Sequence, residues 1–125
     1  MIPRTRPKIV KGETENIETG CGHLFITANS VDGKPFEVFA VLGKAGGCSS
    51  AQLESTCRLI SMALRAGIEP IEIYKQMRGI RCPSGGVFDG QEILSCSDAI
   101  AKSIGKFIPE ASEYVMKKTD NEKTN

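Results

Sequence analysis

The sequence predicts an α+β domain in which antiparallel β-hairpins pack against two or three helices. An alternating apolar pattern over residues 24–42, with an Asp-Gly pair near its centre, is typical of a β-hairpin. A run of helical periodicity follows a glycine-rich loop. At 125 residues the chain is long enough for one hydrophobic core and too short for two. We therefore expect a single compact domain.

The first third of the chain divides into an arm and a hairpin. Residues 1–16 contain two prolines, four basic side chains and no sustained periodicity, which predicts an extended basic arm whose residues 7–10 can add an edge strand. Residues 24–29 are expected to form a strand that turns at Asp32-Gly33 and returns over residues 36–42. The return strand is apolar at both alternating sets of positions, so we expect both of its faces to be covered.

A long helix is predicted after the glycine-rich loop, over residues 49–67. Ser49 and Gln52 form a capping-box pattern at its start, and Gly67 is suited to end it. Cys57 lies on the apolar stripe of this helix, which predicts a buried core thiol.

Two shorter helices and a second hairpin are predicted in the rest of the chain. Pro70 suits the first turn of a helix over residues 70–79. Residues 87–94 have the pattern of a short hairpin, and Ser95 or Ser97 can cap the helix that follows. Pro109 is expected to interrupt that helix.

The predicted organisation is an arm over residues 1–16, a domain over residues 17–108, and a helix turn with a polar tail over residues 109–125. We expect the tail to be disordered from residue 117 onward. A formal charge of +1 gives no electrostatic argument for nucleic-acid binding. The chain has no apolar run of membrane-spanning length and no secretion signal at its start, which predicts a cytoplasmic protein without a membrane partner.

Four of the five cysteines lie at predicted element boundaries, beside glycine, proline or a helix-capping residue. They are Cys21, Cys48, Cys82 and Cys96. Helix starts, where two of them lie, stabilise a thiolate and lower its pKa. Cytoplasmic conditions argue against disulfides, so metal ligation, redox chemistry and inert burial are the alternatives. No Cys-x-x-Cys pair is present, unlike in zinc fingers and ribbons, so the shared context rather than the spacing favours a metal site.

Two further groups are candidate ligand-binding residues. His23 can replace or orient a cysteine ligand, although a strand histidine with a satisfied hydrogen bond is the simpler interpretation. The loop over residues 43–49 leads into a helix and offers Lys44, Gly46, Gly47 and Ser49 to a phosphate. It lacks the spacing of a phosphate-binding P-loop, because its lysine precedes the glycine pair. A single histidine without evident partners argues against a catalytic triad.

Several short motifs occur in an order that resembles one known family. They are Arg6-Pro7-Lys8-Ile9-Val10, Thr19-Gly20-Cys21-Gly22, Pro35-Phe36-Glu37-Val38-Phe39, Leu42-Gly43-Lys44-Ala45-Gly46-Gly47-Cys48, Gly79-Ile80-Arg81-Cys82-Pro83 and Leu94-Ser95-Cys96-Ser97-Asp98-Ala99-Ile100-Ala101. Together they resemble the TSCPD domain, found at the carboxyl end of many adenosylcobalamin-dependent ribonucleotide reductases and as small free-standing proteins. The family signature is Thr-Ser-Cys-Pro-Asp, and this chain has Ser97 in place of the proline.

The resemblance implies an accessory function in nucleotide metabolism. The four boundary cysteines coincide with cysteine positions of the family, which supports one shared site for zinc or a small iron–sulfur cluster. The catalytic barrel and the cobalamin site of those reductases lie in other parts of the large enzymes, so no stand-alone catalysis is expected. We expect a ribonucleotide reductase or another protein as partner. The alternatives are a homo-oligomeric module that binds a nucleotide on the loop over residues 43–49, and a thiol-redox helper.

Overall fold

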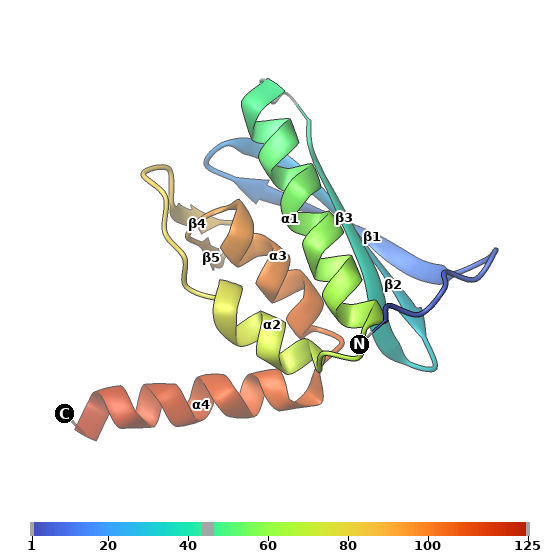
Figure 1. Ribbon diagram of the computed structural model, residues 1–125. Helices are drawn as coiled ribbons and strands as arrows, with labels where there is room; N and C mark the ends of the chain where they lie inside the picture. Colours follow the sequence, from blue (N-terminus) through green and yellow to red (C-terminus); the bar gives the residue numbers. More distant parts are fainter. Residues whose placement is uncertain (1, 44–46, 125) are drawn as a thin grey trace.

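The computed structural model describes residues 2–43 and 47–124 and has an α+β fold, as the sequence predicts (Figure 1). A three-stranded sheet comes first in the chain, and helices and a small second hairpin follow it. The elements in chain order are β1 (Lys11–Thr19), β2 (Gly22–Val31), β3 (Lys34–Leu42), α1 (Gly47–Arg65), α2 (Pro70–Met77), β4 (Gly86–Phe88), β5 (Gln91–Ile93), α3 (Cys96–Gly105) and α4 (Pro109–Thr124).

The main sheet is an antiparallel meander in the order β1-β2-β3. Asp32 and Gly33 form the two-residue turn between β2 and β3, and both have positive φ, at 53° and 78°. Such a turn matches the right-handed twist of the strands that it joins, and it favours an Asp-Gly pair. The predicted hairpin is therefore confirmed, and so is the second hairpin, in which β4 and β5 pair around Asp89-Gly90.

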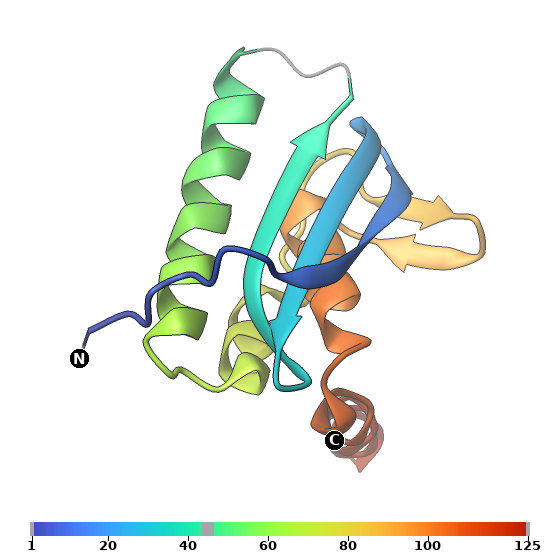
Figure 2. The ribbon, with the colours of Figure 1, turned by 90° about the vertical axis from the view of Figure 1, so that its right-hand side faces the viewer.

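The amino-terminal arm is shorter than predicted. Residues 11–19 form β1, so the part outside the sheet is residues 2–10 (Figure 2). The sequence signal for β1 was weak because most of its side chains are polar, and only Ile17 and Thr19 are buried on the helix side of the sheet. The arm crosses to the end of α1, where the Arg4 amide donates to the Arg65 carbonyl at 3.0 Å.

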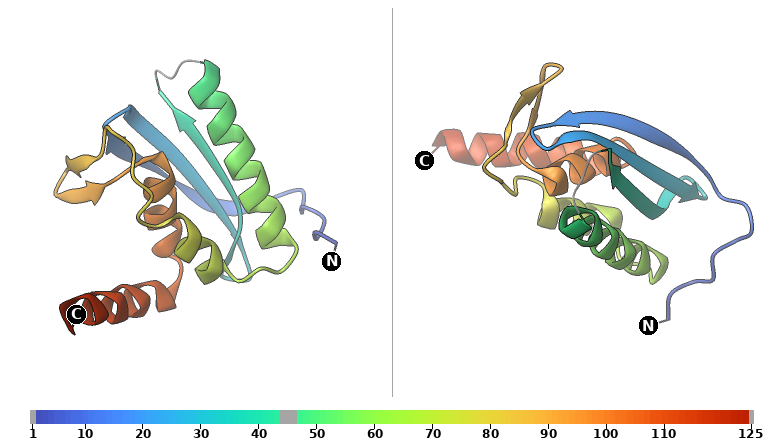
Figure 3. Two further views of the ribbon diagram at one scale, coloured as in Figure 1. Left: turned by 60° about the vertical axis from the view of Figure 1, so that its left-hand side comes forward. Right: turned by 90° about the horizontal axis from the view of Figure 1, so that it is seen from above.

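The helices cover one face of the main sheet, and in the described part of the chain most of the other face is open (Figure 3). α1 runs along β3, α3 packs against β2 and β1, and α2 packs on α3. The buried side chains of these elements form one core, in which Leu24, Ile26, Val38, Ile100 and Ile104 are fully buried.

The prediction that β3 is covered on both faces was wrong. Val38 is fully buried toward the helices, but 48% of Phe39 and 64% of Val41 are exposed on the other face. The alternation of a strand sends neighbouring side chains to opposite faces. On this face the amino-terminal arm covers only one end of β3, where Glu37 is buried and paired with Arg6, and no other described segment covers Phe39 and Val41 (Figure 2).

The helix boundaries differ from prediction at two places. α1 begins at Gly47, which puts Ser49 in its first turn rather than at the N-cap, and it ends before Gly67 as predicted. Ser95 is the N-cap of α3, and its hydroxyl accepts from the amide of Asp98 at 3.0 Å. α4 continues to Thr124, past the point where the sequence predicts a disordered tail.

Candidate functional site: a cluster of cysteines

The turn between β1 and β2 carries Cys21. Thr19 is buried before the turn, and its hydroxyl donates to the carbonyl of Gly22 at 2.8 Å and accepts from the amide of Cys21 at 3.1 Å. One threonine side chain therefore fixes the path of the turn from inside. The Cys21 side chain is exposed at the tip of the turn.

The turn that carries Cys82 lies against the first one. The amide of Cys82 donates to the carbonyl of Leu94 at 2.9 Å. The carbonyl of Cys82 accepts from the amide of Gly85 at 3.1 Å. A Cβ added at Gly20 would stand 1.8 Å from the carbonyl oxygen of Ser84. Only a glycine lets these two backbones approach so closely, and the contact brings the Cys21 and Cys82 turns together.

Cys96 is the first residue of α3, and Asp98 holds the backbone around it in place. The Asp98 side chain is fully buried. Its carboxylate accepts from the amide of Gly79 at 2.8 Å, from the amide of Leu94 at 3.0 Å and from Lys102 Nζ at 2.7 Å. The carboxylate thus joins the end of α2, the segment before α3 and α3 itself, which are the segments that carry Cys82 and Cys96.

The thiol of Cys96 lies beside those of Cys21 and Cys82. Burial raises its pKa above the ordinary value, and the nearby Cys21 and Cys82 raise the pKa further. Its side chain is also within hydrogen-bonding reach of Thr19 and Cys21. The pKa of Cys96 is therefore raised rather than lowered as the helix start predicts, and loss of water is the main cause.

Cys48 lies on the first turn of α1 and is exposed. With Cys21 and Cys96 it lines a hollow of about 300 Å³, whose other walls are Leu42, Ser49, Gln52, Leu53, Thr56, Ser97 and Ile100. The structure therefore places all four predicted cysteines at one end of the molecule. Among the residues that it describes, however, no group of three or more histidine, cysteine, aspartate or glutamate side chains is arranged to hold a metal ion.

The other predicted site residues have different surroundings. His23 is an exposed residue of β2, and its Nδ1 lies 3.1 Å from Asn16 Oδ1, in line with the simpler interpretation of this histidine. Gly47 and Ser49 belong to the first turn of α1, whereas Lys44 and Gly46 lie outside the described residues. Cys57 is buried, as predicted; burial raises its pKa to about 11, although a backbone hydrogen bond from Ala40 acts in the opposite direction.

Thr19 and Asp98 occur in the family motifs, but the sequence analysis did not predict that they organise the cluster. Asp98 stands three residues after the N-cap, a position that often holds an acidic or amide side chain, and this was the available signal. The signals for Thr19 were its place before a glycine and its occurrence in the Thr19-Gly20-Cys21-Gly22 motif. The sequence also did not predict the cleft between α1 and β3, because it arises from the spacing of two elements.

The comparisons agree with the motifs. The family model of the TSCPD domain matches residues 1–108, so this chain belongs to the TSCPD domain family. The comparisons with curated proteins and with solved structures give no match. Within the described part of the chain, none of the helices combines the length and apolarity needed to cross a membrane.

Proposed function

We propose that this protein is an accessory module related to ribonucleotide reductase, in which Cys21, Cys48, Cys82 and Cys96 hold one zinc ion or a small iron–sulfur cluster. The observation that supports the proposal is that Cys21 and Cys82 lie near Cys96, and that Cys48 lines the same hollow as Cys21 and Cys96, although these residues come from four separate segments of the chain. Membership of the TSCPD family supports the link to the reductase.

The donor set fits such a metal chemically. Thiolates are the preferred ligands of structural zinc and of iron–sulfur clusters. Two of the cysteines lie on turns and two lie at helix starts. A bound metal would neutralise the negative charge of their thiolates, which otherwise repel one another. Cys48 is exposed on the first turn of α1, and this turn would have to close on the other three cysteines.

Each segment has a defined role in this proposal. The Thr19 hydroxyl fixes the Cys21 turn, and Asp98 fixes the segments that carry Cys82 and Cys96. Binding would join α1 to the rest of the cluster and stabilise the fold, because a closed four-thiolate site couples metal binding to folding. The module would then present a fixed surface to its reductase partner rather than perform chemistry itself.

The first experiment is elemental analysis with an absorption spectrum, on untagged protein purified without oxygen. About one zinc per chain without colour, or iron with brown absorption, supports the proposal and identifies the metal. Single Cys→Ser changes at the four positions should each remove the metal, whereas Cys57→Ser should keep it because Cys57 lies in the core. Protein that binds neither metal when both are supplied would contradict the proposal.

A thiol-redox function is the second candidate, and the contact between Cys96 and Cys21 favours it. Oxidation of these two thiols to a disulfide would release two protons, and the two electrons would reduce a partner disulfide to two thiols. The raised pKa of Cys96 makes it a poor attacking thiolate at neutral pH. We would measure the reduction potential of the metal-free protein, with Cys21→Ser as control. This measurement distinguishes the thiol-redox function from the metal site.

A further inference from the structure

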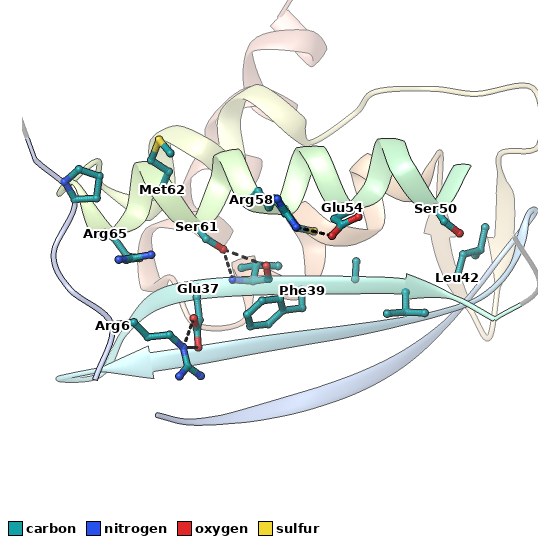
Figure 4. A pocket seen from close by; sticks show the side chains of 15 residues that line it. Arg6, Glu37, Phe39, Leu42, Ser50, Glu54, Arg58, Ser61, Met62 and Arg65 are labelled. Atoms are coloured by element: carbon teal, nitrogen blue, oxygen red, sulfur yellow. Dashed lines mark hydrogen bonds and ion pairs between the residues drawn. The ribbon is translucent and has the colours of Figure 1, made fainter. Parts of the chain in front are cut away.

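A second concave site lies on the opposite side of α1 from the cysteine hollow. This cleft, between α1 and β3, has a volume of about 830 Å³, which is the size of a small-molecule site (Figure 4). Its floor is formed by β3 from Glu37 to Leu42, its wall by one face of α1, and one end by Pro3 and Arg6 of the arm. We call it the α1–β3 cleft.

The outer edge of β3 in the cleft is already paired with side chains of α1. The Ser61 hydroxyl accepts from the Val38 amide at 3.0 Å and lies 3.2 Å from the Val38 carbonyl, to which it donates. The Ala40 backbone hydrogen-bonds to the Cys57 side chain. A peptide cannot add to this edge as a further strand at Val38 and Ala40, because the backbone groups there are already hydrogen-bonded to side chains of α1. An occupant must therefore be recognised by side chains.

The side chains at the rim are apolar and exposed. Exposed fractions are 48% for Phe39, 64% for Val41 and 55% for Met62, and all three line the cleft. Large apolar side chains grouped around a concave site are typical of ligand contact rather than of ordinary surface.

The arm end of the cleft has an excess of positive charge. The guanidinium groups of Arg6 and Arg65 face it, against one buried carboxylate, Glu37, which Arg6 Nε contacts at 2.9 Å. In the middle of the cleft, Arg58 and Glu54 form their own ion pair at 2.8 Å. Arg65 Nε donates to the Arg4 carbonyl of the arm. The two terminal nitrogens of Arg65 have no hydrogen-bond acceptor among the described residues.

We propose that the α1–β3 cleft binds a small organic carboxylate with an apolar chain. The chain lies along Phe39 and Met62, and the carboxylate faces Arg65. Charge complementarity decides the occupant: an uncharged chain would leave the terminal nitrogens of Arg65 without an acceptor, and a cation would meet repulsion. This site is independent of the cysteine cluster.

The test is a titration of ¹⁵N-labelled full chain with octanoate, octan-1-ol and octylammonium, which share one chain length and differ in charge. Octanoate should shift the amides of residues 38–42 and of α1, and bind about tenfold more tightly than octan-1-ol. Octylammonium should bind more weakly than octan-1-ol. Equal binding of all three compounds, or no shifts at these residues, would overturn the proposal.

Matched variants locate the two parts of the site. Phe39→Ser should weaken octanoate binding about tenfold, whereas Phe25→Ser, on the same open face but outside the cleft, should leave it within about twofold. Arg65→Gln should remove the preference for octanoate over octan-1-ol, and Arg58→Gln should keep it because that guanidinium is already paired.

Thermal unfolding of each variant checks that the fold is intact. The Cys48→Ser variant should bind octanoate like the unchanged protein, so that failure of the cleft proposal and failure of the metal proposal give different results. If no octyl compound binds, and the ligand-free amides of the cleft shift with protein concentration, a second copy of the chain occupies it and the proposal is wrong.

Discussion

Replacing Asp98 by asparagine tests the physical account of the cysteine cluster most directly. In the unchanged protein one carboxylate oxygen accepts from the Gly79 amide, and the other accepts from the Leu94 amide and Lys102 Nζ. An asparagine side chain at this position would keep one acceptor oxygen, but its NH₂ group would face the donors that the second oxygen serves. The surrounding atoms leave no water-accessible surface on this side chain, so the mismatch cannot be solvated there.

The magnitude follows from the number of bonds lost. Lys102 is partly exposed and can turn to water, which leaves one backbone amide without an acceptor and one charge-assisted bond weakened. An unsatisfied buried donor costs about 1–3 kcal/mol, and bonds to charged groups contribute about 1.5–3 kcal/mol. We therefore expect Asp98→Asn to lower the free energy of unfolding by about 2–4 kcal/mol.

The assay is chemical denaturation followed by circular dichroism, with Asp89→Asn as matched control. Asp89 is exposed in the β4–β5 turn at a φ of 51°, a conformation that asparagine adopts readily, so this control should change stability by less than about 0.5 kcal/mol. A loss below about 1 kcal/mol in Asp98→Asn, relative to the control, would refute the reasoning that the carboxylate joins the three segments.

Three further predictions concern single residues. Gly20→Ala should destabilise the fold by about 2–4 kcal/mol because its Cβ would meet the Ser84 carbonyl, while Gly47→Ala, with open space around its Cβ, should be neutral in the same denaturation assay. Burial raises the pKa of Glu37, but hydrogen bonds from Arg6 and Asn29 and the nearby positive charges lower it more, so the net pKa lies below 4.5. The contribution of Glu37 to stability is thus present above pH 4.5 and lost as the pH falls through the lowered pKa. In unfolding measured from about pH 6 to 2, the Glu37→Gln variant should lose less stability on acidification than the unchanged protein. The buried thiol of Cys57, with a pKa of about 11, should resist iodoacetamide at about pH 8 under conditions that alkylate exposed Cys21, as read by mass spectrometry; equal labelling would contradict its place in the core.

The sequence by itself determined the local structure well wherever one residue type sets the backbone. The Asp32-Gly33 and Asp89-Gly90 turns and the apolar stripe of α1 were predicted from the chain and are present in the structure. Ser95 was one of the two caps predicted for α3, and it is the N-cap. β1 was not predicted, because its polar side chains conceal a strand whose pairing with β2 is decided by the partner strand. The exposure of Phe39 and Val41 was also missed, since cover on a sheet face depends on where the helices pack.

For the candidate site, the sequence identified which cysteines lie at element boundaries, and that context separated Cys57 from the others. Only the tertiary structure decided which of them meet. The Cys21 and Cys82 turns lie together because Gly20 and Ser84 allow their backbones to touch, a contact between residues distant in sequence. Tertiary structure also decided the pKa of Cys96: a helix start favours the thiolate locally, but burial among neighbouring thiols, which no local pattern encodes, favours the protonated form.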